Sequence, residues 1–255
     1  MDTWNPQQYE RFRAERTQPL LDLISLVQRR PGMRVLDLGC GTGEGTRQLH
    51  EQLAAKETVG LDSSAAMLAK AAPLAGQGLR FEQGEIERLD PGSRWDLIFS
   101  NAALHWVSDH GELLPRLASL LDAGGQLAVQ MPANHLHQSH RTAYDLADES
   151  PFVEALNGWR REVPVLVPEA YATLLHALGF RRQHVRLEVY GHELRSRAEV
   201  VEWVKGSLLT DYQSRLPPAL YEEFLARYQA RLLPLLENAV PFFYTYPRLF
   251  LWGQK

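Results

Sequence analysis

Three glycines alternate with other residues in the stretch Gly39-Cys40-Gly41-Thr42-Gly43, directly after the apolar run 34–38. Glycines let the backbone approach a ligand where any side chain would clash. A turn that follows a strand and opens a helix directs backbone N–H groups and the positive end of the helix dipole toward the crevice above the sheet. The pattern therefore predicts a ligand site at this turn. Asp37, two residues before the first glycine, suits a ligand with a cationic end.

A second acid, Asp62, ends the next apolar run and lies 19 residues after Gly43. In α/β proteins that bind nucleosides, an acid at this place accepts hydrogen bonds from the ribose hydroxyls. The dinucleotide fingerprint requires a further glycine where this chain has Glu44, and a carboxylate there would face a pyrophosphate. The spacing therefore favours a nucleoside ligand and disfavours a nucleotide-dependent oxidoreductase.

Polar and aromatic side chains also follow the third and fourth apolar runs. Glu85 and Ile86 come after the third, and an acid beside an apolar residue suits an adenine, with the carboxylate toward the amino group. Asn101 ends the fourth run, and His105 and Trp106 follow it shortly. Because ligands bind outside the carboxyl ends of parallel strands, we expect these side chains beside the same crevice.

Short apolar runs alternate with helical patterns over the first half of the chain, and such alternation implies a parallel sheet with helices on both faces. We predict an α/β, Rossmann-like fold with a seven-stranded, mostly parallel sheet. The predicted strands are 34–38, 58–61, 79–82, 95–100, 126–131, 184–190 and 246–252. The predicted helices are 7–30, 44–54, a helix with Met67 and Leu68, 111–121 (ended by Gly124-Gly125), 141–148, 168–178, 198–209 and 217–236.

The alternation stops after Pro132, and residues 193–244 are helical in pattern before the last strand. We therefore expect one domain over residues 1–255, with three functional parts. Residues 1–30 form an N-terminal helical cap, residues 34–132 form the cofactor-binding core, and residues 193–244 form a helical lid that closes over the ligand.

Composition excludes several classes of protein. With 27 basic and 31 acidic residues the chain is mildly acidic, which argues against nucleic acid as a partner. No apolar run approaches the length of a membrane span, and the first six residues do not resemble a secretory signal. The one cysteine, Cys40, cannot form an internal disulfide, so we expect a cytoplasmic location. The histidines of 135–140 have mixed spacings without acidic support, and we expect no metal site.

Together these segments resemble the class I S-adenosylmethionine-dependent methyltransferases. The resemblance covers about residues 34–131 and implies S-adenosyl-L-methionine as the cofactor and S-adenosyl-L-homocysteine as its product. In that family the glycine turn holds the methionine moiety, the acid after the second strand binds the ribose, and the acid after the third contacts adenine. The cofactor-binding positions this implies are Asp37, Gly39, Cys40, Gly41, Gly43, Asp62, Ser63, Met67, Glu85, Ile86 and Asn101.

A narrower resemblance, to the trans-aconitate 2-methyltransferases, extends over nearly the whole chain. It is carried by Trp4-Asn5-Pro6, Asp62-Ser63-Ser64 with Met67, Ala128-Val129-Gln130-Met131-Pro132, Trp203-Val204 and Tyr246-Pro247-Arg248-Leu249-Phe250. It implies formation of a methyl ester on trans-aconitate or a related acid. That family has a Gly-Leu-Arg-Pro-aromatic stretch after Trp-Val, whereas this chain has Ser207 to Tyr212, so another acid is an open alternative.

A carboxylic acid substrate requires cations, and Arg16 and Arg248 are the first candidates for its carboxylates. Tyr9, Trp106, Tyr190 and Trp203 are the predicted pocket walls. A carboxylate is already ionised at neutral pH, so no catalytic base is required. His105 is the candidate base if the acceptor is a phenol or an enol.

Other functions stay open at this stage. The chain could methylate a different metabolite, such as a quinone precursor or a carrier-bound acyl group, or it could be a non-catalytic cofactor-binding module. For a carboxylic acid methyltransferase we expect a small-molecule partner, no nucleic acid, no membrane, and a monomer or homodimer.

Overall fold

A computed structural model describes the backbone of residues 13–255 and the side chains of residues 17–255. The strands are β1 (Arg34–Leu38), β2 (Glu57–Asp62), β3 (Leu79–Gln83), β4 (Trp95–Asn101), β5 (Leu121–Pro132), β6 (Arg182–Leu194) and β7 (Phe242–Gln254). The α-helices are α2 (Arg13–Leu26), α3 (Glu44–Leu53), α4 (Ala65–Ala71), α5 (His110–Ser119), α6 (Gln138–Ala147), α7 (Phe152–Ala155), α8 (Pro168–Ala177), α9 (Glu199–Lys205), α10 (Leu208–Arg215) and α11 (Pro218–Leu232). Short 3-10 helices are η1 (Ala72–Leu74), η2 (Ile86–Arg88), η3 (Leu104–Trp106) and η4 (Leu233–Leu235). None of these described helices is long and apolar enough to cross a membrane.

The strands form one seven-stranded sheet in the order β3-β2-β1-β4-β5-β7-β6. Strands β1 to β5 pair in parallel: β1 with β2 and β4, β2 with β3, and β4 with β5. Strand β7 runs antiparallel to β5. The prediction of a seven-stranded, mostly parallel α/β sheet is confirmed. The carboxyl ends of β1 to β5 therefore meet at one edge of the sheet.

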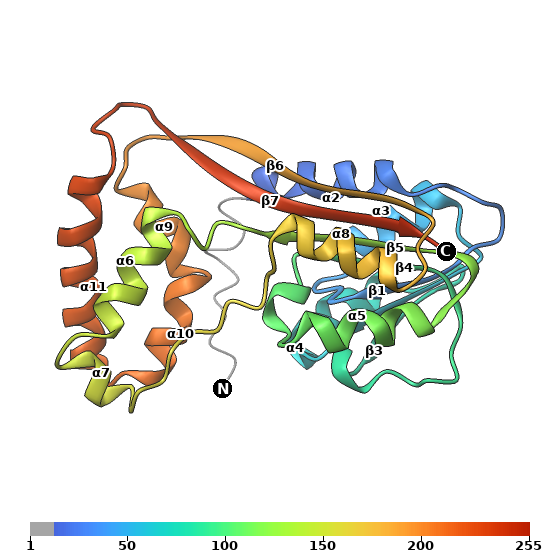
Figure 1. Ribbon diagram of the computed structural model, residues 1–255, viewed down its shortest axis with the longest axis horizontal. Helices are drawn as coiled ribbons and strands as arrows, with labels where there is room; N and C mark the ends of the chain where they lie inside the picture. Colours follow the sequence, from blue (N-terminus) through green and yellow to red (C-terminus); the bar gives the residue numbers. More distant parts are fainter. Residues whose placement is uncertain (1–12) are drawn as a thin grey trace. The chain divides into compact units, whose positions relative to one another are not determined.

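The described chain divides into two compact units. The sheet unit contains Thr17–Pro132, Pro164–Glu188 and Arg248–Lys255, and the helical unit contains Ala133–Val163 and Val189–Pro247. In the sheet unit, α2 and α3 lie on one side of the sheet, and α5 and α8 lie on the other (Figure 1). The central strands β1 and β4 are almost fully buried, because helices cover both of their faces.

The helical unit has its own aromatic core. Phe152 packs edge-on against Phe224, with ring centroids 5.0 Å apart, and Tyr212 stacks on Phe224 at 4.8 Å. α6 and α11 contact each other along this core (Figure 1). Fully buried aromatic rings of this kind each contribute about 3–5 kcal/mol, measured as the loss on truncation to alanine.

The predicted end of the helix before β5 is wrong. The helix predicted over 111–121 ends at Ser119, and Gly124-Gly125 lie inside β5 rather than ending the helix. The register explains this, since Trp95 pairs with Leu121 while Leu97 pairs with Gln126, so β5 carries extra residues opposite one residue of β4. The glycines supply this bulge, and Gly124 has φ +73°.

The remaining helix predictions differ in extent. α2 ends at Leu26 rather than at 30, and the stretch 198–209 divides into α9 and α10 around Gly206 and Ser207. The stretch 217–236 is α11 followed by η4, with a proline inside the 3-10 turn. The irregular segment after Pro132 contains α7 as well as the expected helix near 141–148, which is α6.

Candidate functional site

The glycine turn joins β1 to α3 and is held by β2. The amides of Gly39 and Cys40 both donate to the carbonyl oxygen of Leu61, at 2.8 and 3.0 Å. The amide of Gly41 donates to Asp62 Oδ2 at 2.8 Å. The turn and the acid at the end of β2 are thus brought together, as the sequence predicts.

Gly39, Gly41 and Gly43 all have positive φ, which favours glycine, but the space around Gly39 and Gly41 differs. Gly39 has φ +75°, and a Cβ there would lie 2.2 Å from the Cβ of Ala103. Gly41 has φ +56°, but a Cβ there would meet nothing within 4 Å. Open space beside a left-handed residue at the carboxyl edge of the sheet leaves room for a ligand against the backbone, and the role of this turn in binding the cofactor stays a prediction.

Asp37 is a buried carboxyl group at this edge. Its Oδ2 accepts a hydrogen bond from Thr46 Oγ1 on α3 at 2.6 Å. Burial raises the pKa of Asp37 from 3.8 to about 7; the Thr46 hydrogen bond lowers it, and the nearby charge of Asp62 raises it further. A buried carboxyl group at this pKa gains its charge most readily when a cation lies against it.

Asp62 organises two backbone segments with its two oxygens. Besides accepting from Gly41, it accepts from the amide of Ser64 through Oδ1 at 2.9 Å. Ser64, rather than Ser63, caps α4, because its Oγ accepts from the amide of Met67 at 3.4 Å. The structure therefore fixes the acid relative to both the glycine turn and α4.

Glu85 and Ile86 lie where the sequence expects them, directly after β3. Ile86 opens η2, and Glu85 forms an ion pair with Arg88 at 2.9 Å. The Glu85 side chain is 53% exposed. An exposed carboxylate in a surface ion pair can exchange its partner for a ligand at little loss of stability.

The segment after β4 brings together three predicted residues. Asn101 ends the strand, and its buried Oδ1 has no hydrogen-bond partner among the residues the structure describes. His105 and Trp106 lie in η3 with ring centroids 4.8 Å apart. Trp106 is 51% exposed, which is unusual for a tryptophan, so the edge presents an open aromatic surface.

His110 holds this segment and was not singled out from the sequence. Its Nε2 lies 2.9 Å from the carbonyl oxygen of Leu104, and its Nδ1 hydrogen-bonds the hydroxyl of Tyr171 on α8. Burial lowers the pKa of His110, which favours the neutral ring. Nε2 then donates to Leu104 and Nδ1 accepts from Tyr171. Only a polar residue at a helix start signalled it in the sequence.

The predicted substrate residues fall in different parts of the chain. Arg248 is a buried residue of β7 in the sheet unit. Tyr190 lies on β6 in the helical unit, and Trp203 is buried there on α9, packed against Tyr244 and Tyr246. Tyr9 lies outside the described residues, as does the side chain of Arg16. The pocket roles of all these residues stay predictions.

A partly buried ion pair lies at the segment that replaces the family's arginine-containing stretch. Arg161 Nε donates to Asp211 Oδ2 on α10 at 2.8 Å, and the Arg215 guanidinium lies 3.7 Å from the other oxygen of Asp211. The acid in the divergent segment is therefore neutralised within the helical unit. Arg161 was not singled out from the sequence, since nothing distinguishes it there from neighbouring exposed arginines.

The histidines of 135–140 and Cys40 remain to be placed. His137 caps α6 by accepting from the amide of Ser139 at 3.1 Å, and His140 is buried with its pKa lowered to about 3 by desolvation. No cluster of three or more metal-ligating side chains occurs among the described residues. Cys40 is buried in the glycine turn, and burial raises the pKa of its thiol, so it packs as a neutral group.

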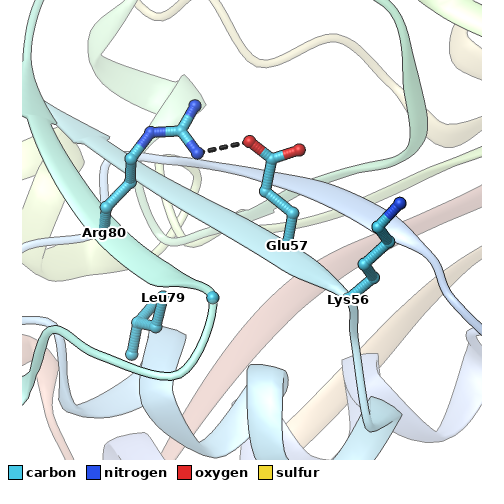
Figure 2. A pocket seen from close by; sticks show the side chains of 5 residues that line it. Lys56, Glu57, Leu79 and Arg80 are labelled. Carbon is cyan, nitrogen blue, oxygen red and sulfur yellow. Dashed lines mark hydrogen bonds and ion pairs between the residues drawn. The ribbon is translucent and has the colours of Figure 1, made fainter.

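A surface pocket lies at the opposite edge of the sheet. Its lining residues are Lys56, Glu57, Gly78, Leu79 and Arg80, at the amino ends of β2 and β3 (Figure 2). Glu57 pairs there with Arg80 and accepts from Arg34 Nε at 2.8 Å. Because parallel sheets bind ligands at the carboxyl ends of their strands, this pocket is not the site predicted by the glycine turn.

Comparisons with known proteins agree with this geometry. A family model described as a methyltransferase domain matches residues 29–167. A trans-aconitate 2-methyltransferase of Deinococcus radiodurans is 47% identical over 90% of each chain. One of Variovorax paradoxus is 38% identical over 99% of this chain and 98% of its own. Among solved structures, the YcgJ protein of Bacillus subtilis has a TM-score of 0.62 at 17% identity, covering 94% of this chain and 98% of its own.

Proposed function

The chain belongs to the methyltransferase domain family, and from this premise we propose that it forms a methyl ester on a small carboxylic acid, with S-adenosylmethionine as the methyl donor. Trans-aconitate or a related acid is the proposed acceptor, because relatives that cover nearly the whole chain carry that activity in their names. The observation that carries the proposal is the glycine turn with the buried Asp37 beside it, at the carboxyl edge of the sheet.

The residues at this edge suit the cofactor. The open space at Gly41 leaves room for a ligand against the backbone, and Asp37 would face its cationic methionine end. Asp62 would accept from the ribose hydroxyls, and Glu85 with Ile86 would take the adenine. The buried Oδ1 of Asn101, which lacks a partner among the described residues, would accept from a donor group of the ligand. We propose that five further residues also bind the cofactor: Ser63, Met67, Cys40, Gly39 and Gly43.

The chemistry requires positioning more than proton transfer. When bound, S-adenosylmethionine would supply a methyl group on its sulfonium, and a carboxylate oxygen of the acceptor would form the new O–C bond in line as the C–S bond breaks and S-adenosylhomocysteine leaves. A carboxylate has a pKa near ~4 and is ionised at neutral pH, so the protein needs no general base. Holding the acceptor oxygen in line and excluding water then supplies the rate enhancement, since effective molarities reach ~10⁵–10⁸ M for well-oriented groups.

Cations and aromatic rings would bind the acceptor. We propose Arg248 and Arg16 as the carboxylate ligands, because a guanidinium fork matches a carboxylate in geometry. His105, Trp106, Tyr9, Tyr190 and Trp203 are the proposed walls, and residues 193–244 the proposed lid. The single cysteine supports a cytoplasmic location, and the acidic composition supports a small molecule rather than nucleic acid as the partner.

Turnover of methyl-labelled S-adenosylmethionine against a panel of di- and tricarboxylic acids tests the proposal. A base-labile methylated product from trans-aconitate or another acid is the expected result. Calorimetry with S-adenosylhomocysteine runs in parallel. Tight cofactor binding without any methylated acid would overturn the acceptor class, and absence of cofactor binding would overturn the whole proposal.

A further inference from the structure

Two buried glutamines on β5 differ in the hydrogen bonding of their side-chain amides. Gln126 and Gln130 are both fully buried. Gln126 Oε1 accepts from the amide of Gln28 at 2.8 Å and from Trp252 Nε1 at 3.0 Å, and its Nε2 donates to the Gln28 carbonyl at 2.8 Å. Gln130 has no hydrogen-bond partner for either Oε1 or Nε2 among the described residues.

An unpaired buried amide is costly in a folded protein. Each unsatisfied buried polar group costs about 1–3 kcal/mol, and native structures keep few of them. An apolar residue of similar size at Gln130 would avoid this cost, since the neighbouring strand residues are apolar and buried. The unpaired amide therefore indicates a group that acquires its partner from a ligand.

The strand register places Gln130 at the ligand-binding edge. Gln130 pairs with Asn101 at the end of β4 and with Phe250 on β7, and its carbonyl accepts from the Ala102 amide at 2.9 Å. Directly paired residues project to the same face of a sheet, and so do residues two apart on one strand. Gln130 thus shares its sheet face with Asn101 and with Arg248, which lies two residues before Phe250.

The strand order indicates whether Gln130 would contact the cofactor or the methyl acceptor. The glycine turn, Asp62 and Glu85 follow β1, β2 and β3, so the cofactor's contacts run from β1 toward that side of the sheet. β5 lies on the other side of β4 from β1. A ligand group at Gln130 therefore belongs to the methyl acceptor rather than to the nucleoside.

We propose that Gln130 binds the methyl acceptor, with Nε2 donating a hydrogen bond to an oxygen of its carboxylate on the sheet face that also carries Arg248. This inference rests on the proposed function and adds a specificity-determining residue to it. A neutral amide on the same sheet face as a guanidinium orients a carboxylate without adding a second charge, so the acceptor oxygen is held in one direction.

The matched pair Gln130→Met and Gln126→Met tests the inference. Methionine keeps the length and volume of the side chain while removing the amide. For Gln130→Met we expect an unchanged or higher Tm of the ligand-free protein, unchanged affinity for S-adenosylhomocysteine, and a KM for trans-aconitate raised about 10-fold or more, the factor that 1.4 kcal/mol produces. For Gln126→Met we expect Tm to fall by at least about 4 °C, with KM unchanged, because three hydrogen bonds are lost.

Opposite results would overturn the inference. A fall in Tm for Gln130→Met like that of Gln126→Met would show a structural amide, and an unchanged KM would show that no acceptor contact exists. Gln130→Glu adds a second readout, because a carboxylate there would repel an anionic acceptor and raise KM further. If wild-type protein methylates only a neutral acceptor, the proposed function fails. A raised KM of Gln130→Met for that acceptor would then keep the acceptor site and overturn the carboxylate contact.

Discussion

Two carboxyl groups at opposite edges of the same sheet have pKa values shifted in opposite directions. At the amino edge, hydrogen bonds from Arg34 and Arg80 lower the pKa of Glu57. At the carboxyl edge, burial raises the pKa of Asp37 to about 7, with Thr46 as its hydrogen-bond donor. Glu57 has cationic partners within the fold, whereas Asp37 lies in a buried site where a cation would stabilise its charged form.

The same contrast holds for the buried glutamines, since Gln126 forms three hydrogen bonds through its amide and the Gln130 amide forms none among the described residues. Toward the amino ends of the strands, Glu57 and Gln126 stabilise the fold as hydrogen-bonded groups. Toward the carboxyl ends, Asn101 Oδ1 and the Gln130 amide have no hydrogen-bond partner among the described residues, at a cost in stability, and a ligand can satisfy them.

Gly39, directly after β1, and Gly32, shortly before it, should show the largest difference in cofactor binding on substitution. Gly39→Ala places a Cβ 2.2 Å from that of Ala103, so we expect a stability loss of about 2–4 kcal/mol and at least ~100-fold weaker binding of S-adenosylhomocysteine. Gly32 also has positive φ, but a Cβ there meets nothing within 4 Å. Gly32→Ala should cost about 1 kcal/mol and leave binding unchanged. Equal losses of binding in both variants, measured by calorimetry, would contradict this assignment.

Asp37→Asn should give the next largest effect. A raised pKa means that folding takes up a proton between pH about 4 and about 7, so this group's contribution to stability falls as pH rises through that window. Asp37→Asn should therefore stabilise the ligand-free protein at pH 8 while weakening S-adenosylhomocysteine binding about 10- to 100-fold.

Wild-type affinity for S-adenosylhomocysteine should rise with pH up to about 7 and then level off, because a cationic ligand end favours the ionised carboxyl group. Calorimetry in buffers of different ionisation enthalpy would detect the released proton. A pH-independent affinity in the wild-type protein would contradict the contact between Asp37 and the cation.

Glu57→Gln should have a smaller effect, confined to stability. Its ion pairs are partly exposed, so we expect a loss of about 1 kcal/mol or less at neutral pH. A lowered pKa stabilises the fold above the ordinary value of 4.5, and this contribution disappears as pH falls through the native pKa. Urea unfolding at pH 7 and at pH 3 measures the difference. A weakened affinity of this variant for the cofactor would contradict the assignment of Glu57 to stability and of Asp37 to binding.

His105→Ala should change catalysis least. Because a carboxylate acceptor needs no general base, kcat should fall by less than about 10-fold, and the pH–rate profile should keep its shape. Loss of about 10²–10⁴ in kcat is typical of removing a general base and would indicate a phenolic or enolic acceptor instead. Leu104→Ala removes a buried apolar side chain next to His105, so it controls for a loss of kcat that comes only from disturbed packing of this segment.

Strand positions near the glycine turn could be predicted from sequence because local signals agree there. β1 starts and ends where its apolar run does, and Asp62 ends β2 as the spacing requires. The start of β5 could not be predicted in this way. Leu121 has helix-forming neighbours, but pairing with Trp95 draws it into the sheet, and the bulge that follows depends on the register of β4.

Within the site, the sequence identified residues by type and spacing but not by their partners. It placed Asp37, Asp62 and Asn101 at strand ends, yet the raised pKa of Asp37 depends on how deeply α3 and the sheet bury it. It passed over His110, whose role follows only from its distances to Leu104 and Tyr171. Gln130 carried one signal, a polar residue among apolar strand neighbours, and Gln126 on the same strand carried the same signal.

By itself, the sequence determined the alternation of strands and helices, the glycine turn and the acids that follow the strands, because these depend on local periodicity and on backbone freedom. Only the tertiary structure decided which buried polar groups are satisfied. Gln126 meets Gln28 and Trp252, residues distant from it in sequence, while Gln130 on the same strand meets no partner among the described residues. Hydrogen-bond satisfaction is a property of packing, which no local pattern encodes.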